Sequence, residues 1–215
     1  MLKKNIPDSF SMLLFAAVWL LTLGGGIVAA GWSWDFANGL GFAAVAGLVY
    51  LCVQGAGRVA VLQHQAFSYV VVLLVVVHAA WFLIADSVVV EYLKPGAPAY
   101  MWAGLLSLFS ILFLVISARP TARKKSFLNR LSFRGWHRAL SWLAIGAALF
   151  HILGSSLYVR DALQYLLLML IILPALAPTP WSRYFDLRGY PSSSLLMLAV
   201  CLAAAISLSR NVWQL

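Results

Sequence analysis

Long apolar runs separated by short polar stretches dominate the hydrophobic pattern of this chain. Seven runs stand out, at about 10–31, 36–57, 60–85, 99–118, 135–158, 162–177 and 193–209. A helix needs about 20 apolar residues to cross a bilayer, and the strict alternation typical of barrel strands is absent from these runs. The pattern therefore predicts an all-α polytopic membrane protein with seven transmembrane helices. The run at 162–177 is the shortest and contains Pro174, so its limits are the least defined.

Composition agrees with this prediction. The 215 residues are 63% hydrophobic and only 10% charged, whereas a soluble domain carries about 25% charged residues. We expect a single transmembrane domain over residues 1–215. The N-terminal run from Phe10 to Ala30 resembles a signal peptide, but its 21 residues exceed a typical signal core, so we interpret it as a retained first helix.

The charges predict an orientation. If the N-terminus is cytoplasmic, three basic residues fall outside, Lys94, Arg160 and Arg210. The other twelve fall inside: Lys3, Lys4, Arg58, Arg119, Arg123, Lys124, Lys125, Arg130, Arg134, Arg138, Arg183 and Arg188. Four of the six acidic residues, Asp35, Asp86, Glu91 and Asp161, fall outside. The positive-inside rule favours this orientation, and it accounts for the net charge of +9 without a nucleic-acid partner.

All four histidines lie in two of the predicted helices. His64 and His78 are in the 60–85 segment, and His137 and His151 are in the 135–158 segment. Each pair is fourteen residues apart, a spacing that returns a helical side chain to within about 40° of its starting direction and separates the two by about 21 Å. Ionisable residues inside spans are rare and usually functional. Each helix is therefore predicted to present two histidines on one face at two depths.

This arrangement favours haem. The two helices run in the same direction, so if they are neighbours, His64 is level with His137 near the inner side and His78 is level with His151 near the outer side. Two opposed imidazoles at one level are the axial ligands of a b-type haem, and the absence of CxxCH excludes a c-type haem. A zinc or copper site needs three or four ligands at one level, and Cys52 and Cys201 have no partner at metal spacing. Structural histidines in a transporter or scaffold, another metal, and a proton relay remain alternatives.

The stretches QHQAFSYVVVLLVVVHAAWF (63–82) and WHRALSWLAIGAALFHILG (136–154) resemble the ferric reductase-like transmembrane family. That family includes ferric reductases, the haem core of NADPH oxidases and the haem subunit of a periplasmic methionine sulfoxide reductase system. The resemblance implies haem ligation by His64 with His137 and by His78 with His151. It keeps the family's His-basic dipeptide at His137–Arg138 but not at position 65, which is Gln. Ferric reductases usually continue into a flavin and nicotinamide domain, whereas this chain continues into a seventh span without GxGxxG.

Other residues near the histidines have weaker candidate roles. Arg58, Arg134 and Arg138 are candidate partners of haem propionates at the inner side, although inward positive charge explains them equally well. Gly146 and Gly154 could make room for a macrocycle. An interfacial aromatic belt explains most of the aromatic residues near helix ends, which are Trp81, Trp102, Trp136, Trp142, Tyr158 and Trp181.

From the sequence we therefore expect a six-helix haem core at about 10–178, followed by an extra span at about 193–209, in a bacterial inner membrane. The predicted function is electron transfer through two b-haems from a cytoplasmic donor to an outer acceptor, namely ferric iron, oxygen or a periplasmic reductase. The chain would be an oxidoreductase component whose donor is a separate flavoprotein, reduced flavin or quinol. The alternatives are a cytochrome b anchor that exchanges electrons between a dehydrogenase and the quinone pool, and a haem-free transporter or scaffold.

Overall fold

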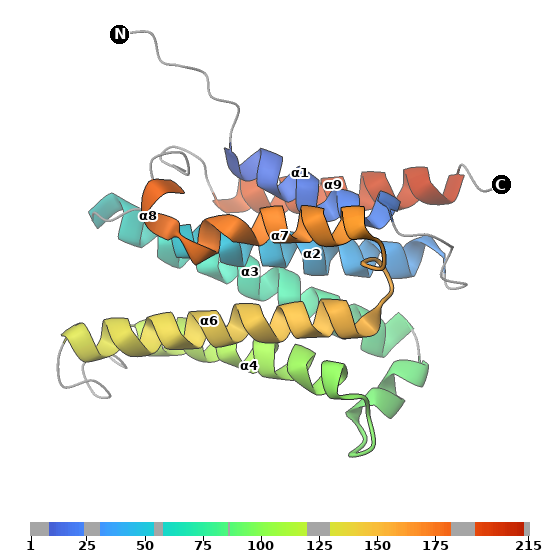
Figure 1. Cartoon of the computed structure of the whole chain (residues 1–215), viewed down its shortest axis with the longest axis horizontal. Helices are drawn as coiled ribbons and strands as arrows, with labels where there is room; N and C mark the ends of the chain where they lie inside the picture. The colour runs from blue at the N-terminus through green and yellow to red at the C-terminus, as the bar shows by residue number, and fades with distance from the viewer. Residues whose placement is uncertain are drawn as a thin grey trace, which may run out of the picture. The chain divides into compact units, whose positions relative to one another are not determined.

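A computed structural model describes residues 9–23, 31–53, 58–85, 87–119, 130–181 and 192–212 (Figure 1). Every regular element in these ranges is helical, so the predicted all-α polytopic class is confirmed. The elements are α1 (Ser9–Leu23), α2 (Trp32–Val53), α3 (Arg58–Ala85), the 3₁₀ helix η1 (Ser87–Leu93), α4 (Ala99–Ala118), α6 (Arg130–Ser155), α7 (Ala162–Leu176), α8 (Pro178–Trp181) and α9 (Ser192–Val212).

Each of the seven predicted segments contains an α-helix. Five of them, in α2, α3, α4, α6 and α9, are long and apolar enough to cross a membrane, and the apolar helices Phe10–Thr22 and Ala162–Leu176 are shorter. The second of these contains Pro174, as expected. The part of the first predicted helix beyond Leu23, up to Ala30, lies outside the described residues. These helices make the chain an integral membrane protein.

Two boundaries of α6 differ from the prediction. The helix begins at Arg130 rather than near residue 135, because a helix can continue past the hydrocarbon into polar surroundings, where basic residues are good helix formers. It ends at Ser155 rather than 158. Ser156 has a left-handed backbone with φ of 50°, and its amide N–H donates to the Leu153 carbonyl, which is how many helices terminate.

Helix α4 has the inside-out polarity of a membrane helix. Its bulky apolar residues Phe109, Phe113 and Ile116 are exposed, whereas Ser107 and Ser110 are buried. Ser107 Oγ donates to the Ala144 carbonyl of α6 over 2.9 Å. Small polar residues suit a helix interface in lipid because they let the backbones approach and hydrogen-bond across it. The exposed apolar face is the face that lipid would cover.

The described helices group into two compact units. The first, here the α2 unit, contains residues Met1–Ala85 and Leu157–Leu215, and the second, the α4 unit, contains Asp86–Ser156. In the α2 unit, α2 is the central helix and packs against α1, α3, α7 and α9. In the α4 unit, α4 and α6 lie side by side, as Figure 1 shows in green and yellow.

Glycines let α2 approach its neighbours closely. A Cβ placed on Gly39 would lie 2.9 Å from the Ala203 Cβ of α9, and one placed on Gly47 would lie 2.6 Å from the Val71 Cγ2 of α3. At the far end of the same interface, Tyr50 of α2 stacks edge-to-face on Phe67 of α3 with ring centroids 5.3 Å apart. The order of these contacts shows that α2 and α3 run antiparallel.

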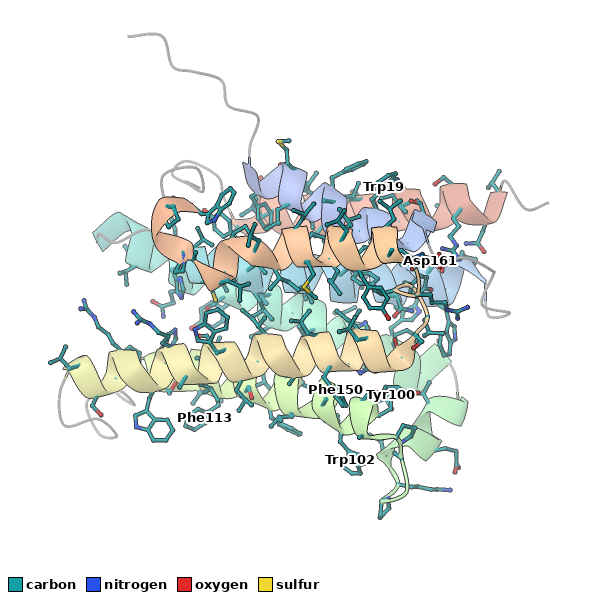
Figure 2. All side chains as sticks on the ribbon, viewed as in Figure 1. Trp19, Tyr100, Trp102, Phe113, Phe150 and Asp161 are labelled. Atoms are coloured by element: carbon teal, nitrogen blue, oxygen red, sulfur yellow. The ribbon has the colours of Figure 1, made fainter. Side chains whose placement is uncertain are left out.

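The α4 and α6 helices also form an antiparallel pair. Tyr100, near the start of α4, contacts Gly154 near the end of α6, and Ser107 contacts Ala144 about two to three turns further along. In Figure 2 Tyr100 lies beside the C-terminal part of α6, whereas Trp102 projects outward from α4. The two units thus each contain an antiparallel helix pair whose second helix carries two histidines.

Gly154 is predicted to be essential for this packing. Replacing it with alanine would place a Cβ 2.5 Å from the Tyr100 Cβ, an atom next to the backbone that cannot rotate away. We expect Gly154→Ala to destabilise the protein by about 1–3 kcal/mol, the usual cost of overpacking. The measurement is the unfolding midpoint in detergent. Gly146→Ala is the control, because no atom of the described residues lies within 4 Å of a Cβ there, and equal effects of the two changes would contradict this assignment. The space beside Gly154 is filled by Tyr100, so this glycine serves the packing of α4 on α6.

Candidate functional site

The four histidines divide equally between the two units. His64 and His78 are on α3, and His137 and His151 are on α6. All four side chains are half-buried. Both intervals of fourteen residues lie within uninterrupted helix, so each pair shares one face with its members about 21 Å apart along the axis. The prediction that each pair lies within a single helix is confirmed.

His78 is held by the backbone of α2. Its Nδ1 lies 2.8 Å from the Ala37 carbonyl oxygen, and a Cβ on Gly41 would lie 2.9 Å from the imidazole ring. The edge of the ring packs against Phe82 with centroids 5.2 Å apart. The imidazole therefore packs on α2 where the Ala37 carbonyl is accessible beside Gly41.

His151 is held in the same way by α4. Its Nδ1 lies 2.9 Å from the carbonyl oxygen of Tyr100, a residue that is labelled in Figure 2. A Cβ on Gly104 would lie 2.9 Å from His151 Nδ1. In both units, then, the carbonyl belongs to one residue of the neighbouring helix and the glycine follows it by four positions.

This contact determines the tautomer of each neutral imidazole. A carbonyl oxygen can only accept a hydrogen bond, so Nδ1 must carry the proton and donate it. Nε2 then carries the lone pair, on the side of the ring away from the carbonyl. Histidines that ligate metals almost always donate their other ring N–H to a carbonyl, carboxylate or water, which orients the ring and raises its basicity. His78 and His151 therefore fit the requirements for axial haem ligands.

The other two histidines lie two turns into their helices. His137 packs against Phe133 with ring centroids 5.3 Å apart and an interplanar angle of 35°. One turn apart on the same helix, Arg134 and Arg138 are both exposed. Arg58 begins α3, but its side chain lies outside the described residues. The role of these arginines toward propionates stays a prediction.

Among the described residues, no three histidine, cysteine, aspartate or glutamate side chains come together as a metal-binding group. Cys52 is half-buried and Cys201 is exposed, and both are free thiols. A zinc or copper centre assembled from this part of the chain would need such a group. A pair of histidines that serve as axial ligands does not.

A buried polar cluster at the start of α2 was not predicted from the sequence. Asp35 accepts a hydrogen bond at Oδ1 from the Tyr158 hydroxyl over 2.6 Å and one at Oδ2 from Asn211 Nδ2 over 3.0 Å. Its Oδ2 also lies 3.2 Å from Arg210 Nε, and the Asp35 and Arg210 side chains are 3% and 7% exposed. The only sequence signal was that charge placed Asp35 and Arg210 on the same side of the membrane.

Tyr158 belongs to this cluster and not to an interfacial aromatic belt. It is only 3% exposed and lies in the link between α6 and α7. The Arg210 guanidinium carbon lies 5.5 Å from the centroid of its ring. Burial, followed by the hydrogen bond to Asp35, raises the pKa of the Tyr158 phenol well above its usual range. Tyr158 therefore remains a hydrogen-bond donor to the carboxylate at physiological pH.

Comparisons with protein-family models, with curated proteins and with solved structures find no match to this chain.

Proposed function

We propose that this protein transfers electrons across a membrane through two bis-histidine b-haems, one held by His64 with His137 and one by His78 with His151. The observation that carries the proposal is the shared environment of His78 and His151. Two histidines from different units, 73 positions apart in the sequence, each donate Nδ1–H to a backbone carbonyl of the neighbouring helix. A histidine used only for packing has no need for the same tautomer and the same glycine at both places.

The spacing of the histidines supports the two-level arrangement. A separation of about 21 Å between the members of each pair is too large for one metal ion but suits two haems at different depths of a bilayer about 30 Å thick. When bound, the haems supply the one-electron chemistry. The chain supplies axial imidazoles, a dry apolar surrounding and the distance between the two sites, which together set the reduction potentials and the route.

We propose further that electrons enter on the cytoplasmic side, where the basic residues gather, and leave on the outer side. The donor would be a separate flavoprotein, reduced flavin or quinol, and the acceptor would be ferric iron, oxygen or a periplasmic reductase. The exposed Arg134 and Arg138 next to His137 would pair with the propionates of the inner haem. Their guanidinium groups suit carboxylates because they can donate two parallel hydrogen bonds.

The first test of this function is the visible spectrum of the purified protein. After expression with haem available, we expect a reduced α-band typical of b-type haem and a haem content of about two per chain, since four histidines supply two axial pairs. A colourless protein under these conditions would overturn the proposal and favour a haem-free transporter or scaffold. If haem is present, re-oxidation by quinone in place of an outer acceptor would assign the protein to the cytochrome b anchors.

A further inference from the structure

Two glycines, Gly41 on α2 and Gly104 on α4, occupy equivalent positions in the two helix pairs. Each lies four residues after the carbonyl to which a histidine donates, Ala37 for Gly41 and Tyr100 for Gly104. Neither glycine is at a helix end or has a positive φ that would call for glycine. The presence of glycine at the same four-residue interval in both helix pairs therefore needs another explanation.

Helix geometry provides one. In an α-helix the carbonyl of residue n accepts from the N–H of residue n+4, and the side chain of residue n+4 tilts back toward the N-terminus and lies beside that carbonyl. With glycine at n+4 the side of the carbonyl is uncovered. An imidazole from the neighbouring helix can then reach it as a second donor.

The distances agree with this account. A Cβ on Gly41 would lie 2.9 Å from both Nδ1 and Cε1 of His78, and a Cβ on Gly104 would lie 2.9 Å from Nδ1 and 3.1 Å from Cε1 of His151. The 2.9 Å approaches to Nδ1 are shorter than real Cβ atoms show, so any side chain at either position would compete with the imidazole for the same space. Because the imidazole can rotate about its side-chain bonds and the helix backbone cannot, the imidazole is the group that would move.

We propose that Gly41 and Gly104 are positioning residues that fix His78 and His151 as Nδ1–H tautomers and so make Nε2 the nitrogen that binds the metal. The tautomer is a property of the protein alone. Its use in haem ligation rests on the proposed function. The two glycines act in separate units, so each provides a control for the other.

The test uses the full-length protein, expressed without a haem supply and labelled with ¹⁵N at histidine. At about pH 8, above the ordinary histidine pKa of about 6.5, the protonated and unprotonated ring nitrogens of a neutral imidazole resonate far apart. The signals are assigned by replacing one histidine at a time with asparagine. We expect Nδ1–H with unprotonated Nε2 at His78 and His151 in the unmodified protein.

Gly41→Ala should move the His78 signals toward a mixture of tautomers and leave those of His151 unchanged, and Gly104→Ala should do the reverse. Gly146→Ala, whose added Cβ would have no described atom within 4 Å, should change neither. A dominant Nε2–H tautomer at His78 and His151 in the unmodified protein would overturn the inference, even if the glycine variants did not fold. Unchanged His78 signals in Gly41→Ala would overturn it as well.

A haem titration separates this inference from the proposed function. Loss of the hydrogen bond that orients a metal-binding histidine typically weakens metal binding about 10–100-fold. Gly41→Ala and Gly104→Ala should therefore each lower the affinity for the haem shared by His78 and His151 by about that factor. If no variant and no parent protein binds haem, the proposed function fails while the tautomer result stands. If two haems bind and the glycine variants hold them as tightly as the parent does, the positioning role fails while the proposed function stands.

Discussion

Replacing His78 with alanine is expected to lower the haem content of the purified protein from about two per chain to about one, because it removes one axial ligand from one of the two proposed bis-histidine sites. His151→Ala should have the same effect and should remove the same haem, and the double variant should lose no more than either single variant. His64→Ala and His137→Ala should each remove the other haem, and their double variant should lose no more than either single variant. The measurements are the pyridine haemochrome content and the reduced-minus-oxidised spectrum at low temperature, where the two α-bands separate.

Two further variants sharpen this result. His78→Met replaces the imidazole with a thioether that can also serve as an axial ligand, so we expect the haem to be retained in part with a higher reduction potential. Val76→Ala is the matched control, because this side chain lies on α3 two residues away and is exposed, and it should leave the spectrum unchanged. Loss of both haems from His78→Ala in a protein that still folds would contradict the assignment of histidines to two levels, as would loss of neither.

Asp35→Asn is expected to destabilise the protein by about 3–5 kcal/mol, the usual cost of removing one partner of a buried ion pair. The amide would keep the shape of the side chain but leave the buried Arg210 guanidinium without its counter-charge. Arg210→Met should cost less, because the Asp35 carboxylate would still accept hydrogen bonds from Tyr158 and Asn211. The measurement is the unfolding midpoint in detergent by circular dichroism.

The exposed pair between Lys94 and Glu91 is the control for this prediction. Both side chains are more than half exposed, and surface pairs contribute about 0–1 kcal/mol. Glu91→Gln should therefore shift the midpoint little. A double variant with leucine at position 35 and methionine at position 210 should recover most of the loss, since it removes both buried charges together. Equal midpoints for Asp35→Asn and Glu91→Gln would show that the buried cluster does not stabilise the fold.

The bounds of a helix could be predicted closely where the hydrocarbon core of the membrane alone determines them. The run at 99–118 coincides with α4, and the run at 60–85 lies within α3. In lipid every backbone polar group must find its partner within the same helix, so an apolar run of the right length specifies a helix without knowledge of its neighbours. The first turn of α6 at Arg130 was missed because it is formed by a mixed polar and apolar sequence. The 3₁₀ helix η1 was missed because its seven residues are too few to span a membrane, so the rule does not apply to it.

The candidate site was predictable only in part. The equal spacing of His64–His78 and His137–His151 follows from the sequence, because helical periodicity is known in advance. The contact of His78 with the Ala37 carbonyl depends on the register of α2 against α3, which side-chain packing along the whole interface sets. No local pattern specifies that register.

The sequence by itself therefore determined that the chain is a polytopic helical membrane protein, and which helices carry two histidines on one face. These conclusions rest on bilayer thickness, backbone hydrogen bonding and helical periodicity, all of which act within one segment. Only the tertiary structure decided that Gly41 and Gly104 uncover a carbonyl for an imidazole, and that Asp35 meets a partner 176 residues away in Asn211. Such contacts depend on close packing between segments distant in the chain, and on shape complementarity that the pattern of one segment does not contain.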